Sequence, residues 1–237
     1  VTITASTGES CTDATPTAGS GTTALYGCPI TFNTAGSRTL IANFSSSTTH
    51  TDSASTAEPH AVVAVLTVSP ASLPGGVFGA AYSQSVSANG IGSTPPYAYL
   101  VSSGALPGGL ALNGVSGNLS GTPTATGTFN FDIIATDSSP GGVGGPFSGI
   151  RAYSVTITQA NQGTLVATAS PSSIAFGATS TLGTTGGSGT GAVTYAVTAG
   201  GSFCSVTGTT LTGTGVGICT VTATKAADVN YTAATAT

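Results

Sequence analysis

Apolar and polar residues alternate along much of this chain with a period of two. In "FNFDIIATD", residues 129–137, the side chains of Phe129, Phe131, Ile133 and Ala135 fall on one side and polar side chains fall mainly on the other. Successive side chains of a β-strand point to opposite faces. This pattern therefore predicts a half-buried strand with its aromatic and aliphatic face turned inward.

Further strands are predicted in the same region, between residues 64 and 158. They are "AVLTVSP", "AAYSQSVSA", "YAYLVSSG" and "AYSVTIT", separated by turns rich in Gly and Pro. Short strands at this spacing are typical of a β-sandwich. The run "HAVVAVLTV", residues 60–68, is too short to span a bilayer, and we interpret it as one buried strand.

Two cysteines near the end of the chain lie in phase with apolar neighbours. Cys204 alternates with Val206, and Cys219 alternates with Val221. A hairpin that closes near "TGTTLTGTG", residues 207–215, would bring their strands together with both sulfur atoms inward. Closing a loop of 15 residues stabilises a fold by roughly 3 kcal/mol on chain entropy.

A second pair lies near the beginning of the chain. Cys28 is part of the alternating segment "YGCPITF", and Cys11 precedes it by 17 residues. Four cysteines allow three pairings. We expect the local pairs Cys11–Cys28 and Cys204–Cys219, because the pairs lie in different segments, with free buried thiols or a metal site as alternatives. Disulfides would place the protein in an oxidising, extracytoplasmic compartment.

The charge content excludes some classes of function. Only 4% of residues are charged, against about 25% in an average soluble domain. Three cations and a net charge of −4 cannot form the basic surface that nucleic-acid binding requires. No run of 18 apolar residues predicts a transmembrane helix.

Candidate chemistry is sparse. His50 and His60 flank Asp52 and Glu58, but no Gly-x-Ser-x-Gly motif accompanies them, and we interpret this stretch as an exposed linker between domains. We expect no catalytic residues, no cofactor and no metal site.

Calcium is the metal alternative, with Asp132 and Asp137 as its candidate ligands. Calcium takes six to eight oxygen ligands. These two side chains, five residues apart on one strand, point to opposite faces. We therefore expect Asp137 to cap a turn.

The middle segment resembles a known family. Pro96-Tyr97, "SGALPGGL", "LSGTPT" and "FDIIATDS" are similar to the putative immunoglobulin-like domain that occurs in tandem in bacterial surface proteins. Residues 163–237 resemble a second bacterial immunoglobulin-like type through their cysteine pair and "ATKAADVNYTAA". Residues 1–61 resemble the later half of a related repeat, with its two opening strands missing.

These resemblances imply an all-β protein of tandem immunoglobulin-like β-sandwich domains, with a partial domain at 1–62 and further domains at 63–160 and 161–237. The first is expected to be incomplete at its N-terminus, and its opening strands either precede Val1 or come from a neighbour.

The implied function is that of a non-catalytic structural protein of the bacterial cell surface. It would be a subunit or repeat section of an extracellular filament, stalk or adhesin, and β-strand complementation is one route to its assembly. The implied partners are other copies of the chain or adjacent repeats of the same polypeptide. The alternative is a ligand- or carbohydrate-binding adhesion module of a secreted protein.

Overall fold

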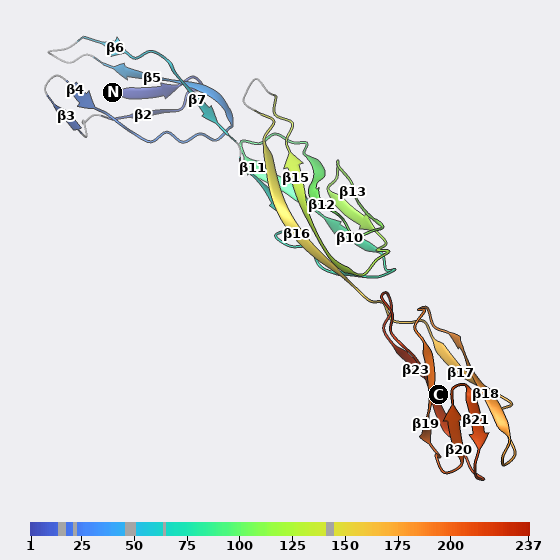
Figure 1. Cartoon of the computed structure of the whole chain (residues 1–237). Helices are drawn as coiled ribbons and strands as arrows, with labels where there is room; N and C mark the ends of the chain where they lie inside the picture. Colours follow the sequence, from blue (N-terminus) through green and yellow to red (C-terminus); the bar gives the residue numbers. More distant parts are fainter. Residues whose placement is uncertain (14–17, 21–22, 46–50, 64, 141–144) are drawn as a thin grey trace.

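The computed structural model describes residues 1–13, 18–20, 23–45, 51–63, 65–140 and 145–237, and in these it contains strands and no helix. Figure 1 shows three groups of strands that follow one another in an extended row. No sheet among these residues joins strands of two groups, and the groups lie on either side of the predicted boundaries at 62/63 and 160/161. The predicted all-β fold class is confirmed, and layers of paired strands are seen in the middle and third units.

The first unit is built around one sheet. Its long central strand, β5, pairs with β1 along one edge and with β6 and β7 along the other, and β2 pairs with the outer edge of β1. A separate hairpin joins β3 and β4. The strands are β1 (Thr2–Ala5), β2 (Ser10–Thr12), β3 (Ala18–Ser20), β4 (Thr23–Leu25), β5 (Gly36–Phe44), β6 (Ser53–Ala54) and β7 (Glu58–Val62).

The middle unit is a sandwich. Its largest sheet has the order β12-β15-β16-β9, and the sheets β10-β14-β13 and β11-β8 complete the fold. Nine strands take part: β8 (Val65–Ser69), β9 (Gly76–Val77), β10 (Tyr82–Ser85), β11 (Ser87–Ile91), β12 (Ala98–Gly104), β13 (Leu110–Leu112), β14 (Asn118–Gly121), β15 (Gly127–Thr136) and β16 (Ser148–Thr158).

The core of the middle unit lies between these layers. The alternation predicted for β15 is confirmed, because Phe131, Ile133 and Ala135 are buried while Phe129 packs against the core from its margin. Its other fully buried large side chains are Leu119, Ile157, Val68, Val86, Val155, Pro107 and Pro123. Pro107 lies in the turn "SGALPGGL", which closes the end of the sandwich.

The third unit has two sheets, β17-β18-β21-β20 and β19-β22-β23. The strands are β17 (Leu165–Ser170), β18 (Thr179–Gly186), β19 (Val193–Ala199), β20 (Cys204–Thr207), β21 (Thr210–Gly213), β22 (Thr220–Lys225) and β23 (Ala234–Ala236). Its buried apolar residues are smaller and fewer than those of the middle unit: Leu165, Leu182, Cys204 and Ala223.

The interpretation of residues 60–68 as one buried strand is wrong. The run divides between β7, which pairs with β5 in the first unit, and β8, which pairs with β11 in the second. Val63 and Val65 are 65% and 71% exposed, whereas Leu66 and Val68 are buried. The aliphatic run is continuous in sequence, but its two halves form strands in the sheets of two different units.

The predicted hairpin between the strands of Cys204 and Cys219 is also wrong. The chain turns back earlier, at Gly208, so that β20 pairs with β21. Gly208 has a φ of +60°, the left-handed conformation that glycine adopts without steric cost. β22 then crosses to the opposite sheet, where it pairs with β19 and β23.

Candidate functional site

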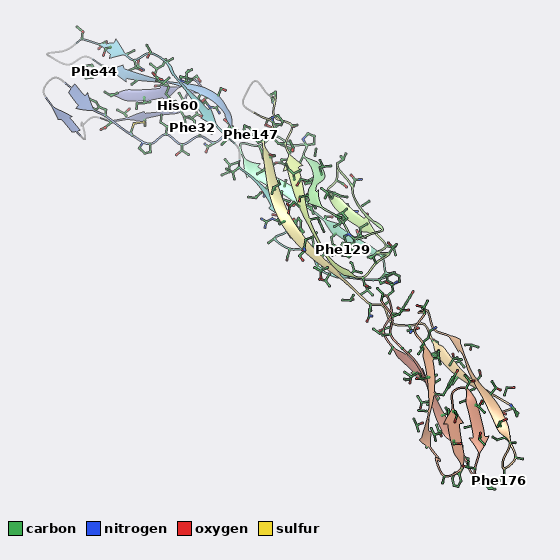
Figure 2. All side chains as sticks on the ribbon, viewed as in Figure 1. Phe32, Phe44, His60, Phe129, Phe147 and Phe176 are labelled. Atoms are coloured by element: carbon green, nitrogen blue, oxygen red, sulfur yellow. A yellow bond between two sulfur atoms is a disulfide. The ribbon has the colours of Figure 1, made fainter. Side chains whose placement is uncertain are left out.

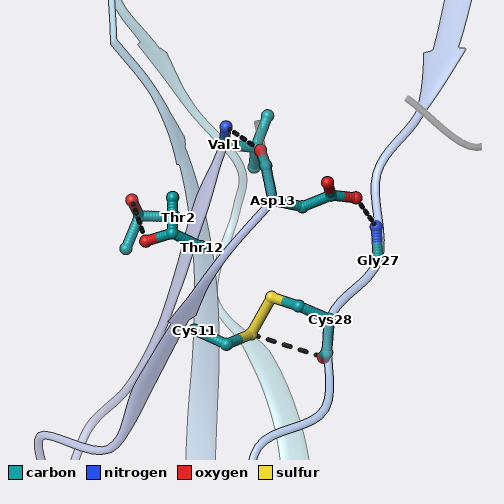
Figure 3. The surroundings of a disulfide bond; sticks show 7 residues. All are labelled: Val1, Thr2, Cys11, Thr12, Asp13, Gly27 and Cys28. Atoms are coloured by element: carbon teal, nitrogen blue, oxygen red, sulfur yellow. Dashed lines mark hydrogen bonds between the residues drawn. A yellow bond between two sulfur atoms is a disulfide. The ribbon is translucent and has the colours of Figure 1, made fainter. Parts of the chain in front are cut away.

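The Cys11–Cys28 disulfide fastens a second layer to the sheet of the first unit (Figure 3). Cys11 lies on β2, and the two Cα atoms are 5.9 Å apart. Residues 26–32 have the predicted alternation of half-buried and exposed side chains, but no strand that the structure describes pairs with them. A hydrogen bond of 2.9 Å from the Gly27 amide to Asp13 Oδ2 holds this segment beside β2.

The Cys204–Cys219 disulfide joins the two sheets of the third unit. Cys204 begins β20 in one sheet, and Cys219 directly precedes β22 in the other, with a Cα–Cα distance of 6.0 Å. Both distances fall in the ordinary range for disulfides. The pairing in the structure is the local one that the sequence predicts, although this bridge connects layers and not neighbouring strands.

Among the described residues of this stretch, the acidic side chains and His60 form no metal-binding cluster. His60 and Glu58 are exposed on β7, opposite Arg38 and Leu40 of β5, so this part of the predicted linker is a strand. His50 lies outside the described residues. Across the part of the chain that the structure describes, no three His, Cys, Asp or Glu side chains gather in a way that could hold a metal ion.

Asp137 is a buried cap at the end of β15. Its Oδ2 atom accepts hydrogen bonds from the Thr94 amide at 2.9 Å and from the Ser139 hydroxyl at 2.6 Å, and its Oδ1 atom accepts one from the Phe147 amide at 2.8 Å. Burial alone would raise the pKa of Asp137, but the hydrogen bonds, that of Ser139 foremost, hold it below its ordinary value. The predicted capping role is confirmed. Asp132, on the same strand, is half-buried.

A matching cap lies in the third unit. Asp228 follows β22, and its Oδ1 atom accepts hydrogen bonds from the amides of Asn230 at 2.9 Å and Tyr231 at 2.8 Å. The hydrogen bond that the Thr190 amide donates is the main reason why the pKa of Asp228 is lowered. Asp228 thereby gives a defined shape to the loop 228–231, which faces the middle unit.

The middle and third units are in direct contact through this loop. The ring of Tyr231 meets the ring of Phe78 edge to face, with centroids 5.4 Å apart and an interplanar angle of 77°. The Thr126 hydroxyl donates a hydrogen bond of 2.8 Å to the Val229 carbonyl, and Ala160 forms an isolated bridge with Tyr231. Aromatic, side-chain and main-chain contacts together define how the two units meet.

The first and middle units meet more loosely. Thr34 forms an isolated bridge with Gly92, and Ala35 packs against the buried Leu66 and Phe147. Beside this contact lies a groove of about 620 Å³, lined by residues of both units: Phe32, Thr34, Ala35, Val62, Val63, Val65, Thr67, Asn89, Gly90 and Ile91.

The first unit itself has little core. Among its described residues only one apolar side chain, that of Ala5, is buried. Arg38 is also buried, where its guanidinium donates hydrogen bonds to Thr34, at 2.9 Å to the carbonyl and 2.6 Å to the hydroxyl, and lies over the Phe32 ring. A half-open groove of about 450 Å³ lies over the sheet, lined by Val1, Ile3, Tyr26, Ala42, Phe44, Ser53, Ala54 and Ser55.

Sequence reasoning missed the contacts that join the units. Phe78 and Tyr231 are both turn aromatics in a chain with only 6% aromatic residues. The sequence did contain one sign of such a contact, which is an aromatic residue beside glycine in a turn, as in "VFGA". It could not reveal the partner, because the two residues are 153 positions apart. No helix among the described residues is long and apolar enough to span a membrane.

Comparison with known proteins identifies the middle unit. The family model described as "Putative Ig domain" matches residues 64–158, less than half of the chain, and confirms the resemblance predicted for that segment. No curated protein matches the chain.

Solved structures that match the chain include human CDH23 EC21-23, with 15% identity and a TM-score of 0.39; the match covers 85% of this chain and 73% of that one. Drosophila N-cadherin EC1-4 matches with 12% identity and a TM-score of 0.38, and the match covers 90% of this chain and 59% of that one. A putative alpha-galactosidase from Bacteroides fragilis matches with 18% identity and a TM-score of 0.30, and the match covers 39% of this chain and 17% of that one. The chain therefore spans less than two thirds of the last two.

Proposed function

We propose that this chain is a non-catalytic structural section of an extracellular filament, stalk or adhesin of the bacterial surface. The observation that carries the proposal is the junction between the middle and third units. There Phe78, Thr126 and the loop 228–231 hold two sandwiches end to end. A protein that holds successive units in fixed relative positions needs contacts of this kind between them. The two disulfides support an extracellular location.

The test compares the shape of the wild-type chain with that of the Phe78→Ala variant by small-angle X-ray scattering. The wild type should give an extended particle with a narrow distribution of its longest dimension. Removing the Phe78 ring should broaden that distribution while each unit stays folded. A compact wild-type particle, or identical scattering from both proteins, would contradict the structural role.

We further propose that the first unit gains a strand from outside residues 1–62, either from a neighbouring copy or from another part of the polypeptide. The groove beside Ile3, Tyr26 and Phe44 supports this, because a β-strand laid over it would cover apolar surface that the unit leaves half-open. Main-chain hydrogen bonds would be added where that strand also pairs along an edge of the unit. The low charge of the chain offers little resistance to association.

This second proposal is tested by mass measurement and hydrogen exchange on residues 1–237 in dilute solution. We expect association, or weak protection in the first unit. A monomer whose first unit is as strongly protected as the middle unit would rule out strand addition.

Ligand binding by an adhesion module is the second candidate function. The groove between the first and middle units favours it, since Val62, Val65 and Ile91 line it together with the polar side chains of Thr67 and Asn89. A screen against glycans and peptides checks this function, with Ile91→Asp as the variant that should abolish any binding found. Binding that survives this variant would place the ligand elsewhere.

A further inference from the structure

The turn that carries Phe78 recurs in the third unit. "FGA" occurs at 78–80 and again at 176–178, each time after the first strand of a sandwich, β8 or β17. Gly79 and Gly177 have φ values of +70° and +79°. In both turns the alanine amide donates to the carbonyl three residues earlier, at 3.2 Å from Ala80 and at 3.0 Å from Ala178. Phe176 therefore occupies in the third unit the position that Phe78 occupies in the second.

A second loop beside each turn also recurs. In each unit the residue four positions after the phenylalanine pairs with the strand that leads into this loop: Tyr82 lies opposite Gly121 of β14, and Ser180 lies opposite Leu211 of β21. The turn and the loop are joined alike in both units, because the Gly79 amide donates to the Pro123 carbonyl at 3.0 Å and the Gly177 amide donates to the Gly213 carbonyl at 2.9 Å. Val216 thus corresponds to Thr126, which donates a hydrogen bond to the Val229 carbonyl, because each lies five residues after the paired strand residue, Leu211 or Gly121.

The two equivalent ends differ in what covers them. Phe78 is half-buried and packs against Tyr231. Phe176 is 74% exposed, and Val216 and Ile218 are 91% and 86% exposed. Figure 2 shows Phe176 at the end of the third unit that is farthest from the middle unit. Exposed apolar side chains gathered at one place commonly mark an interaction surface.

The apolar loop of the third unit is held outward by its own packing. Gly215 and Gly217 lie against the ring of Phe203, where a Cβ atom on Gly217 would come within 2.5 Å of the ring. Only glycine permits this approach, so the backbone is drawn inward at these two positions. Val216 and Ile218 alternate with the glycines and point away from the unit.

We propose that Phe176, Val216 and Ile218 form a docking surface for the Asp-x-Asn-Tyr loop of an immunoglobulin-like unit that follows the third unit in series. The inference rests on the proposed function as a serial structural protein. The Phe176 ring would pack against the tyrosine ring of that loop, as the Phe78 ring packs against Tyr231. Val216, in place of Thr126, would make an apolar contact where the earlier junction has a hydrogen bond.

The direction of the last strand supports a unit in series. β16 ends beside the first of the two turns, where the Phe78 amide donates to the Thr158 carbonyl at 2.9 Å. β23 runs antiparallel to β22, with Ala234 opposite Lys225 and Ala236 opposite Ala223, and so heads toward the Phe176 turn. Each last strand is thus directed to the end of its unit that carries the phenylalanine.

The test uses the full chain extended by a second copy of residues 159–237, so that the added copy brings its own Tyr231. Hydrogen exchange is followed at the amides of Asn230 and Tyr231 in both copies. We expect Phe176→Ala to accelerate exchange in the added copy by roughly three- to tenfold, the effect of losing an aromatic pair. Phe78→Ala should do the same in the original copy, and Val115→Ala, at an exposed site elsewhere, should change neither.

The outcomes separate this inference from the proposed function. If Phe78→Ala accelerates exchange in the original copy but Phe176→Ala does not accelerate it in the added copy, the proposed docking surface is wrong while the serial structural role stands. If neither variant accelerates exchange, the proposed serial structural role is contradicted as well. If the unextended chain associates in solution and Phe176→Ala abolishes the association, the surface joins two copies and the proposed unit in series is wrong.

Discussion

The first and middle units have the same alternation of apolar and polar residues but very different interiors. In the middle unit, side chains from several sheets enclose Ile133, Leu119 and Val155, none of which is measurably exposed. In the first unit, Ile3 and Leu40 lie on one face of the sheet yet stay half-exposed, and Ala5 is the one buried apolar residue among those described.

The difference shows that alternation creates an apolar face but does not bury it. A face is buried only when a second layer covers it, and residues 26–32 cover little of the first sheet. Because hydrophobic stabilisation scales with the apolar area removed from water, the middle unit should be far more stable than the first. Three predictions test this comparison.

The largest effect is expected from opening the core of the middle unit. Ile133→Ala should lower its free energy of unfolding by about 2–5 kcal/mol, because a cavity forms in a closed interior. Leu40→Ala in β5, on the same face as Ala5, should cost less than about 1.5 kcal/mol, because a half-exposed side chain leaves no closed cavity. Hydrogen exchange resolved by unit measures both changes. Equal losses would show that the first unit has a closed core after all.

The next effect concerns the disulfides. Replacing Cys11 and Cys28 by serine should remove a constraint of roughly 3 kcal/mol and abolish slow hydrogen exchange throughout the first unit, because its second layer is tethered there. The same change at Cys204 and Cys219 should weaken the third unit without unfolding it, since two paired sheets remain.

Peptide mapping of the unreduced wild type provides the control for these variants and should yield the two local pairs. A link such as Cys28–Cys204 would contradict the structure. Protection of the first unit that survives the double replacement would show that its core does not depend on the tether.

The smallest of the three effects concerns the buried cap of the middle unit. Asp137→Asn should lower the free energy of unfolding by about 2 kcal/mol, because one amide oxygen cannot accept all the hydrogen bonds that the carboxylate receives. Asp132→Asn, at a half-buried site on the same strand, is the matched control and should change little. A variant at Asp137 as stable as the control would refute the capping role.

The cap also predicts a pH dependence. The pKa of Asp137 is lower in the folded state than its ordinary value of about 3.9. Its contribution to stability is therefore complete above that ordinary value and is lost as the pH falls through the folded pKa. The wild-type middle unit should lose stability on acidification below about pH 4, and Asp137→Asn should remove that part of the loss.

Much of the middle unit could be predicted from its sequence. The inward face of β15 and the turn around Pro107 depend on residues near one another in the chain. The position of Asp137 at a strand end also predicted its capping role, although one of its donors, the Thr94 amide, lies 43 positions away. The predictions that failed concern partners distant in sequence. Residues 60–68 read as one strand because alternation carries no information about where one sheet stops and the next begins.

The sequence by itself determined most of the strands, the turns and the two local cysteine pairs, because strand period, glycine conformation and cysteine phase are local properties. Only the tertiary structure decided which sheet each strand joins, that the Cys204–Cys219 bridge connects two sheets, and that Phe78 meets Tyr231. Each of these depends on how layers pack across long separations in the chain. That packing is settled by the burial of whole faces, which no short stretch of residues specifies.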